Sequence, residues 1–163
     1  MSDRYLIKVL VVFLATIAFR IAGPDSCRAE ERKPNILFIV TDDQGAWTLS
    51  AQDYPNTYTP EIDRLASEGV IIENAFTMSA VSSPSRASLI SGRYCSETDV
   101  LDWIRPDSRK GLDTTLVTWP QLLNNAGYQT ALVGKWHLGD EKHYMPTQRG
   151  YGYFTGFPHG GMR

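Results

Sequence analysis

Apolar runs of strand length alternate with capped helical segments along the central part of this chain. The run Asn35–Val40 is uninterrupted, which is typical of a strand buried on both faces of a parallel sheet. The segment Thr59–Gly69 opens with Thr-Pro and closes with glycine, the usual start and stop signals of a helix. Val70–Phe76 has the pattern of a second strand. This order predicts a βαβ unit with a right-handed crossover, and therefore an α/β fold.

The same signals recur in the second half of the chain. Thr118–Gly127 predicts another capped helix, and Tyr128–Gly134 predicts a third strand. At 163 residues and 42% hydrophobic content, the chain is long enough to form one domain with a core of its own.

The first 29 residues have a different composition. Arg4 and Lys8 precede the apolar run Val9–Phe19, and small residues follow at Cys27–Ala29. This layout predicts a secretory signal peptide over residues 1–29, and export to the periplasm or the medium. The alternative is a membrane anchor, but the apolar run is too short to span a bilayer comfortably. We therefore expect no stable membrane anchor, with the functional domain in residues 30–163.

Charge excludes one class of partner. Residues 30–163 carry 12 Lys and Arg against 16 Asp and Glu, a net charge of −4. The basic residues are scattered rather than clustered, so no nucleic-acid footprint is present.

A serine-rich stretch, Ser82–Arg93, predicts a short helix with a hydroxyl at its beginning. Pro84 suits the first turn, and Gly92 suits the end. We expect Ser82 just before the helix N-terminus, where free N–H groups and the helix dipole favour negative charge. A hydroxyl in that position is either a plain N-cap or a nucleophile directed at an anion.

Two carboxylates, Asp42 and Asp43, directly follow the first apolar run, and Gly45 ends the turn. In open α/β sheets the ligand site lies outside the carboxyl ends of the strands. Adjacent carboxylates repel each other unless a cation lies between them, and oxygen ligands suit Ca²⁺ or Mg²⁺. The alternative is a polar turn that caps the next segment. Because Ser82 follows the second run, both features are expected at the same edge of the sheet.

Lys135 and His137 follow the third predicted strand. In an extended backbone, side chains two residues apart project to the same face. Taken alone, a surface lysine and a lone histidine would be unremarkable.

Four segments together resemble the sulfatase family. Ser82–Arg93 is similar to the signature C/S-x-P-S-R-x-x-x-x-x-G-R, with serine where many members have cysteine. Gly127–His137 resembles the second signature, G-Y-x-T-x-x-x-G-K-W-H, and follows in the expected order. Pro34–Asp43 is similar to P-N-I-x-x-I-x-x-D-D, and Gly150–Gly156 to G-x-x-x-F-x-G.

The resemblance implies an alkaline-phosphatase-like α/β fold, a mostly parallel sheet flanked by helices. It also implies sulfate-ester hydrolysis, in which Ser82 is oxidised by a maturase to formylglycine and the hydrated aldehyde attacks sulfur. Arg86 would hold the hydrated aldehyde, Lys135 would neutralise the sulfate oxygens, and His137 would bind or deprotonate the second hydroxyl. The implied metal ligands are Asp42, Asp43 and Ser82. The family favours Ca²⁺, although the residues themselves do not separate it from Mg²⁺. The implied substrate is a sulfated small molecule or glycan.

One departure from the family is large. Sulfatases are several hundred residues long, and their second metal-ligand pair, another histidine and another lysine come later in the chain. Residues 30–163 are therefore expected to be the N-terminal portion of a catalytic domain, with a fold incomplete at the C-terminus and no activity alone. Two other functions stay open: hydrolysis of a phosphoryl or phosphonate ester with Ser82 unmodified, and a truncated, non-catalytic domain that binds sulfated ligands.

Overall fold

The computed structural model describes residues 33–52 and 56–161. It divides the chain into two compact units, Met1–Thr41 and Asp42–Arg163. The predicted signal peptide, residues 1–29, lies outside the described residues. None of the helices in the described part of the chain is long and apolar enough to cross a membrane.

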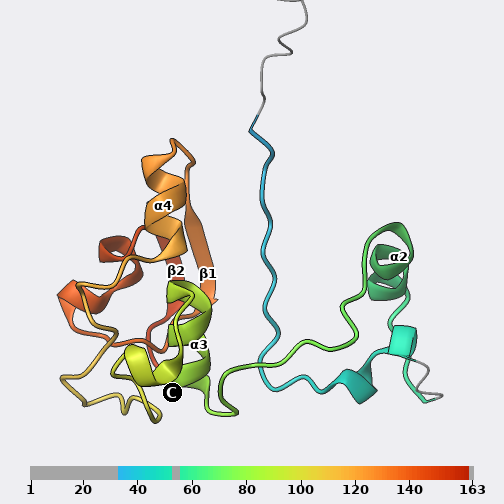
Figure 1. The fold of residues 1–163 in the computed structure, drawn as a ribbon, viewed down its shortest axis with the longest axis horizontal. Helices are drawn as coiled ribbons and strands as arrows, with labels where there is room; N and C mark the ends of the chain where they lie inside the picture. The colour runs from blue at the N-terminus through green and yellow to red at the C-terminus, as the bar shows by residue number, and fades with distance from the viewer. Residues whose placement is uncertain (1–32, 53–55, 162–163) are drawn as a thin grey trace, which may run out of the picture. The chain divides into compact units, whose positions relative to one another are not determined.

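The first apolar run is not a strand. Residues 33–41 contain neither helix nor strand and are drawn as a plain trace in Figure 1. The side chains in this run are exposed, Leu37 to 86%. The prediction of a strand at Asn35–Val40 is therefore wrong for this structure. An apolar sequence can favour burial, but a strand also needs a neighbour to accept and donate its backbone hydrogen bonds.

The second unit begins with short 3₁₀ turns, η2 (Ala46–Thr48) and η3 (Ser50–Gln52), and the helix α2 (Pro60–Glu68). The helix confirms the prediction at Thr59–Gly69, including proline in its first turn. Asp63 of α2 accepts hydrogen bonds from the hydroxyls of Ser50, at 2.7 Å, and Thr59, at 3.2 Å. These bonds hold the start of α2 against η3.

The second predicted strand, Val70–Phe76, is also absent, because no residue of this run lies in a strand. Its large side chains are exposed; Phe76, for example, is 83% accessible. The βαβ unit expected from Asn35–Val40, α2 and Val70–Phe76 therefore does not form.

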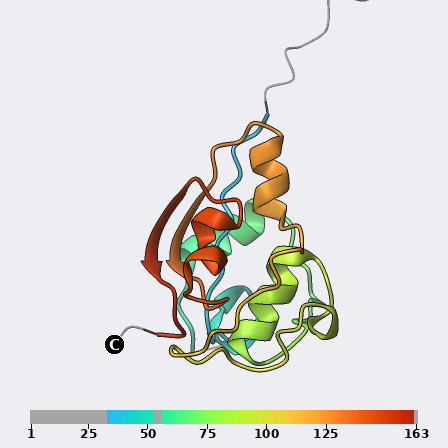
Figure 2. The ribbon, with the colours of Figure 1, turned by 90° about the vertical axis from the view of Figure 1, so that its left-hand side faces the viewer.

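Residues 82–157 contain the remaining elements. They are α3 (Ser82–Ser91), η4 (Cys95–Glu97), α4 (Trp119–Asn125), β1 (Ala131–Lys135), η5 (Lys142–Tyr144), η6 (Pro146–Gln148) and β2 (Tyr153–Phe157). β1 and β2 pair in parallel, with Ala131 opposite Tyr153 and Gly134 opposite Gly156. Figure 2 shows this small parallel sheet flanked by helices. The predicted α/β class is thus confirmed, but by β1 and β2 rather than by the first two apolar runs.

The two strands approach closely at their paired glycines. Gly156 has φ of +147°, and a Cβ atom there would collide with the Gly134 carbonyl. Only glycine meets both the backbone and the steric requirement of that position.

The hydrophobic core lies around α3 and the segment that follows β1. It consists of Ala87, Ile90, Val100, Ile104, Leu112, Trp136, Leu138 and Tyr151. The Trp136 and Tyr151 rings meet edge to face with their centroids 6.2 Å apart. This cluster holds α3 and residues 136–138 together.

A buried arginine fastens the loop that precedes α4. Arg149 is 2% exposed, and its guanidinium donates hydrogen bonds to the carbonyls of Thr114, Asp113 and Leu116 at 2.8–3.0 Å. Thr118, which precedes α4, donates its hydroxyl to the carbonyl of Arg149 at 2.8 Å. The Arg149 side chain thus supplies the hydrogen-bond donors for three carbonyls of this loop.

Candidate active site

Ser82 is the first residue of α3, one position further into the helix than predicted. Val81 has extended dihedrals and acts as the N-cap, and its carbonyl accepts the Ser85 N–H at 3.1 Å. Pro84 lies in the first turn and Gly92, with φ of +68°, ends the helix, as the sequence predicts. Ser82 is half-buried, and its hydroxyl lies at the N-terminus of α3.

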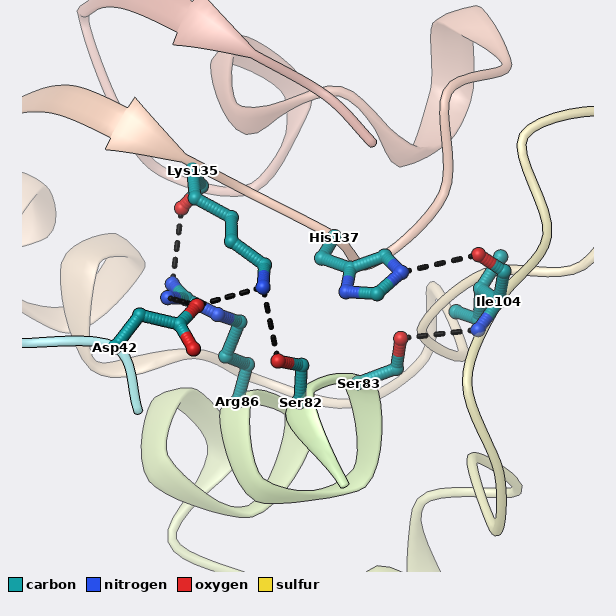
Figure 3. Close-up of polar contacts among 7 residues, drawn as sticks. All are labelled: Asp42, Ser82, Ser83, Arg86, Ile104, Lys135 and His137. Atoms are coloured by element: carbon teal, nitrogen blue, oxygen red, sulfur yellow. Dashed lines mark hydrogen bonds and ion pairs between the residues drawn. The ribbon is translucent and has the colours of Figure 1, made fainter. Parts of the chain in front are cut away.

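A lysine from the sheet contacts this hydroxyl. Lys135 is the last residue of β1, and its ammonium donates to Ser82 Oγ at 2.9 Å (Figure 3). The Lys135 side chain is only 13% exposed, which holds the charge in a partly desolvated position. Since β1 and α3 are far apart in sequence, the core beneath them brings these two groups together.

Asp42 joins the same cluster. One of its oxygens, Oδ2, lies 2.6 Å from Lys135 Nζ and 3.0 Å from Arg86 Nη2. Arg86 also donates through Nη1 to the Lys135 carbonyl at 2.9 Å. The hydrogen bond from Lys135 lowers the pKa of the Asp42 carboxyl below its usual 3.8; partial burial opposes this shift and Arg86 adds to it. Two cations against one anion leave net positive charge beside the Ser82 hydroxyl, which favours an anionic ligand.

His137 is buried and lies beyond the end of β1. Lys135 and His137 were predicted to project to the same face if the backbone between them stays extended. The backbone is not extended at His137, where φ is +60°. The His137 ring nitrogen Nε2 is 3.1 Å from the Ile104 carbonyl. Burial lowers the pKa of the imidazole below 6.5, and the hydrogen bond to Ile104 opposes that shift.

The two predicted carboxylate ligands have different surroundings. Asp42 is bound to the cations described above, whereas Asp43 has a left-handed backbone, φ +64°, and its side chain makes no ion pair or hydrogen bond with the residues that the structure describes. Within the described ranges, no three His, Cys, Asp or Glu side chains gather closely enough to hold a metal ion. Carboxylate and hydroxyl oxygens suit Ca²⁺ or Mg²⁺ chemically, but Ca²⁺ takes six to eight oxygens. Asp42, Asp43 and Ser82 therefore fit part of such a ligand set.

The structure thus brings four of the six predicted residues into one connected cluster: Ser82, Arg86, Lys135 and Asp42. His137 is linked to it through the backbone, because Ile104 donates its N–H to Ser83 Oγ at 3.0 Å while its carbonyl contacts His137 (Figure 3). Neither Ser83 nor Ile104 was among the site residues predicted from the sequence. Ser83 lies within the first signature and could have been singled out there, but no local signal marks Ile104.

A hydroxyl among cations at a helix N-terminus, on a parallel α/β scaffold, defines a site for an anionic group. The family model described as Sulfatase matches residues 34–162, and the chain belongs to the sulfatase family.

Similar proteins agree with this assignment. Arylsulfatase G of Mus musculus is 34% identical over 160 residues, which are 94% of this chain and 30% of that protein. An N-acetylgalactosamine-6-O-sulfatase of Bacteroides thetaiotaomicron is 44% identical over 108 residues, 66% of this chain and 21% of its own length.

Solved structures share the fold. The crystal structure of Ps i-CgsB superposes with a TM-score of 0.77 at 34% identity, over 81% of this chain and 30% of that one. The same protein in complex with k-i-k-neocarrahexaose gives a TM-score of 0.71 at 33% identity, over 75% of this chain and 27% of that one. The chain therefore has part of the alkaline-phosphatase-like α/β fold, and it spans less than a third of each of these relatives.

Proposed function

We propose that this protein hydrolyses a sulfate ester, with Ser82 as the source of the nucleophile. The observation that carries the proposal is the 2.9 Å contact between Lys135 Nζ and Ser82 Oγ at the start of α3, with Arg86 beside it. A sulfate group placed over Ser82 would meet a partly buried ammonium and the free N–H groups of a helix N-terminus.

The nucleophile is proposed to be formylglycine, made from Ser82 by a maturase. The oxidation removes two hydrogens from the side chain and leaves an aldehyde, which water converts to a geminal diol. One hydroxyl of the diol attacks sulfur, and the ester oxygen leaves as the alcohol. Loss of a proton from the other hydroxyl re-forms the aldehyde and releases sulfate.

Three side chains would support these steps. Lys135 would neutralise the sulfate oxygens as a compact point charge, and Arg86 would hold the hydrated aldehyde. Because burial keeps the imidazole neutral near pH 7, His137 is able to accept the proton of the second hydroxyl.

A divalent cation, Ca²⁺ in preference to Mg²⁺, is proposed as the cofactor, held in part by Asp42, Asp43 and the residue at position 82. Such an ion would supply Lewis acidity and orient the diol. Its remaining ligands would have to come from groups other than these three, so we propose that residues 30–163 act as part of a larger catalytic domain and are inactive by themselves.

The substrate class is proposed from the relatives. One is named for a sulfated amino sugar, and one solved relative is bound to a neocarrahexaose. A sulfated glycan, or a small sulfate ester, therefore suits the cationic site. We propose that the protein meets its substrate outside the cell, because residues 1–29 predict export.

The proposal is tested by mass spectrometry of the peptide that contains residue 82, after expression of the complete reading frame with a serine-type maturase. We expect the peptide to be two hydrogens lighter than the unmodified form. An aryl sulfate and a sulfated glycan should be hydrolysed, and Ser82→Ala should abolish turnover while the protein remains folded.

Different results are expected if the protein is a phosphoryl- or phosphonate-ester hydrolase, or if it is a non-catalytic domain that binds sulfated ligands. An unmodified Ser82 together with release of phosphate would favour a phosphoryl- or phosphonate-ester hydrolase. Binding of sulfated ligands without any turnover would favour a non-catalytic domain. Retained sulfatase activity in Ser82→Ala would rule out the proposed nucleophile.

A further inference from the structure

The backbone of Ile104 lies between two buried side chains of the site. Its N–H donates to Ser83 Oγ at 3.0 Å, and its carbonyl oxygen is 3.1 Å from His137 Nε2. Ser83 is 0% exposed and His137 is 4% exposed, so water does not compete for either bond. The buried Ser83 hydroxyl is thus connected to the His137 imidazole by two hydrogen bonds, both made by the backbone of Ile104.

This contact determines which ring nitrogen carries the proton. A carbonyl oxygen can only accept a hydrogen bond, so Nε2 must be the protonated nitrogen. In a neutral imidazole the other nitrogen, Nδ1, then has a bare lone pair. Nδ1 is buried and has no hydrogen-bond partner in the described part of the chain. In Figure 3 it lies on the edge of the ring turned towards Lys135 and Ser82, opposite the edge that contacts Ile104.

The backbone at Gly160 packs closely against the His137 ring. A Cβ atom at Gly160 would lie 2.7 Å from His137 Cε1 and 2.9 Å from Nε2, closer than side chains tolerate. The backbone of this segment is anchored nearby, because the His137 N–H donates to the Pro158 carbonyl at 2.9 Å. A glycine at position 160 therefore lets the chain pass against the imidazole without displacing it.

We propose that Ser83 and Gly160 are positioning residues for His137. Ser83 orients the Ile104 carbonyl, Gly160 leaves room for the ring, and together they hold the tautomer in which Nε2 is protonated and Nδ1 is the bare nitrogen directed into the site. The inference rests on the proposed function in one respect only, which is that Nδ1 is the atom that receives the proton from the nucleophile. The tautomer itself is a property of the fold.

The experiment is ¹⁵N NMR of the imidazole rings in the full chain, labelled at histidine and studied near pH 7. The protein has three histidines, and the signals of His137 are identified by their loss in His137→Gln. In the unsubstituted chain we expect the Nε2 shift of a protonated nitrogen and the Nδ1 shift of an unprotonated one, with no averaging between tautomers. The opposite tautomer, or averaged shifts, would overturn the proposal.

Two variants with matched controls test the positioning residues. Ser83→Ala removes the acceptor for the Ile104 N–H, and we expect averaged His137 tautomers and faster exchange of the Ile104 amide. Ser88→Ala is its control on the same helix, because Ser88 Oγ is buried with no hydrogen-bond partner among the described residues. Gly160→Ala should displace the ring and give the same averaging. Gly161→Ala should not, since nothing lies within 4 Å of a Cβ at that position.

Circular dichroism shows whether each variant is folded. A folded Ser83→Ala chain and a folded Gly160→Ala chain that both keep the single tautomer would contradict the proposal. If the tautomer is as expected but the complete enzyme does not hydrolyse sulfate esters, the proposed function fails and the positioning of His137 stands. If the complete enzyme hydrolyses sulfate esters but His137 has the opposite tautomer, the proposed positioning of His137 fails and the proposed function stands.

Discussion

Apolar segments occur both in residues 33–52 and 56–76 and in residues 82–161, but among these described residues only the second region buries them. The helix α2 has no buried residue, and the runs before and after it are exposed. In the second region eight apolar side chains are buried in one cluster that includes residues of α3 and of the segment that follows β1. An apolar pattern thus shows which surface favours burial, but burial itself requires a partner surface that the pattern does not specify.

The comparison is sharpest for two leucines. Leu112 is 0% exposed in the cluster, whereas Leu37 belongs to an exposed run. Leu112→Ala should lower the free energy of unfolding by about 4 kcal/mol, because it removes packed atoms and leaves a cavity. Leu37→Ala should change it by less than about 0.5 kcal/mol. Urea denaturation followed by circular dichroism measures both, and equal losses would contradict the difference between the regions.

Two arginines make the same comparison for charge. Arg149 is buried on three carbonyls, whereas Arg64 of α2 forms exposed ion pairs with Glu61 and Glu68. Arg149→Met should cost about 3 kcal/mol of unfolding free energy, because three partly buried carbonyls lose the donor that the buried guanidinium supplies. Arg64→Met should cost under about 1 kcal/mol, as is usual for exposed pairs. The same denaturation experiment applies, and an insensitive Arg149 would mean that water replaces its hydrogen bonds.

The helix caps predict a smaller difference. Thr118 precedes α4, where its hydroxyl donates to the buried Arg149 carbonyl and its N–H donates to the side chain of Gln121 at 2.9 Å. Thr59 precedes α2 and bonds to Asp63 in a half-exposed position. Thr118→Ala should cost about 1 kcal/mol and Thr59→Ala less. Thermal melts of the two variants, measured together, provide the comparison.

The smallest expected effect is on pH dependence, at Asp42, a residue of the first region that forms ion pairs with Arg86 and Lys135 of the second. The pKa of Asp42 is lowered in the folded chain, chiefly by Lys135, so its ionised form stabilises the fold above the unfolded pKa of about 3.9. That contribution is lost as the pH falls through the lower, folded-state value. Asp42→Asn should therefore be less stable than the parent at pH 7, and the difference should vanish towards acid pH. Denaturation in chelator-treated buffer from pH 7 to acid measures it; a difference independent of pH would exclude the ion pair as its cause.

The elements that the sequence predicted well are those with local signals. The helices α2 and α4 occur where threonine, proline and glycine mark their ends, and α3 occurs where Pro84 and Gly92 mark it. The third strand was predicted at Tyr128–Gly134 instead of Ala131–Lys135, so its start was placed three residues too early and its end one residue too early, and β2 was not predicted as a strand at all. Helix signals are local because a helix satisfies its own backbone, whereas a strand exists only together with a partner.

In the candidate active site, too, some features follow from the sequence alone and others depend on tertiary packing. The sequence by itself determined the family, the two signatures, and the residue types that meet at Ser82 and Lys135. Only the tertiary structure decided that Asp42 pairs with Lys135 and Arg86, that His137 leaves the extended backbone, and that Ser83 reaches it through Ile104. Those contacts join residues far apart in the chain, and they depend on how the core around α3 and β1 packs. Packing distances of a few ångströms are not encoded in the spacing of residues along one segment.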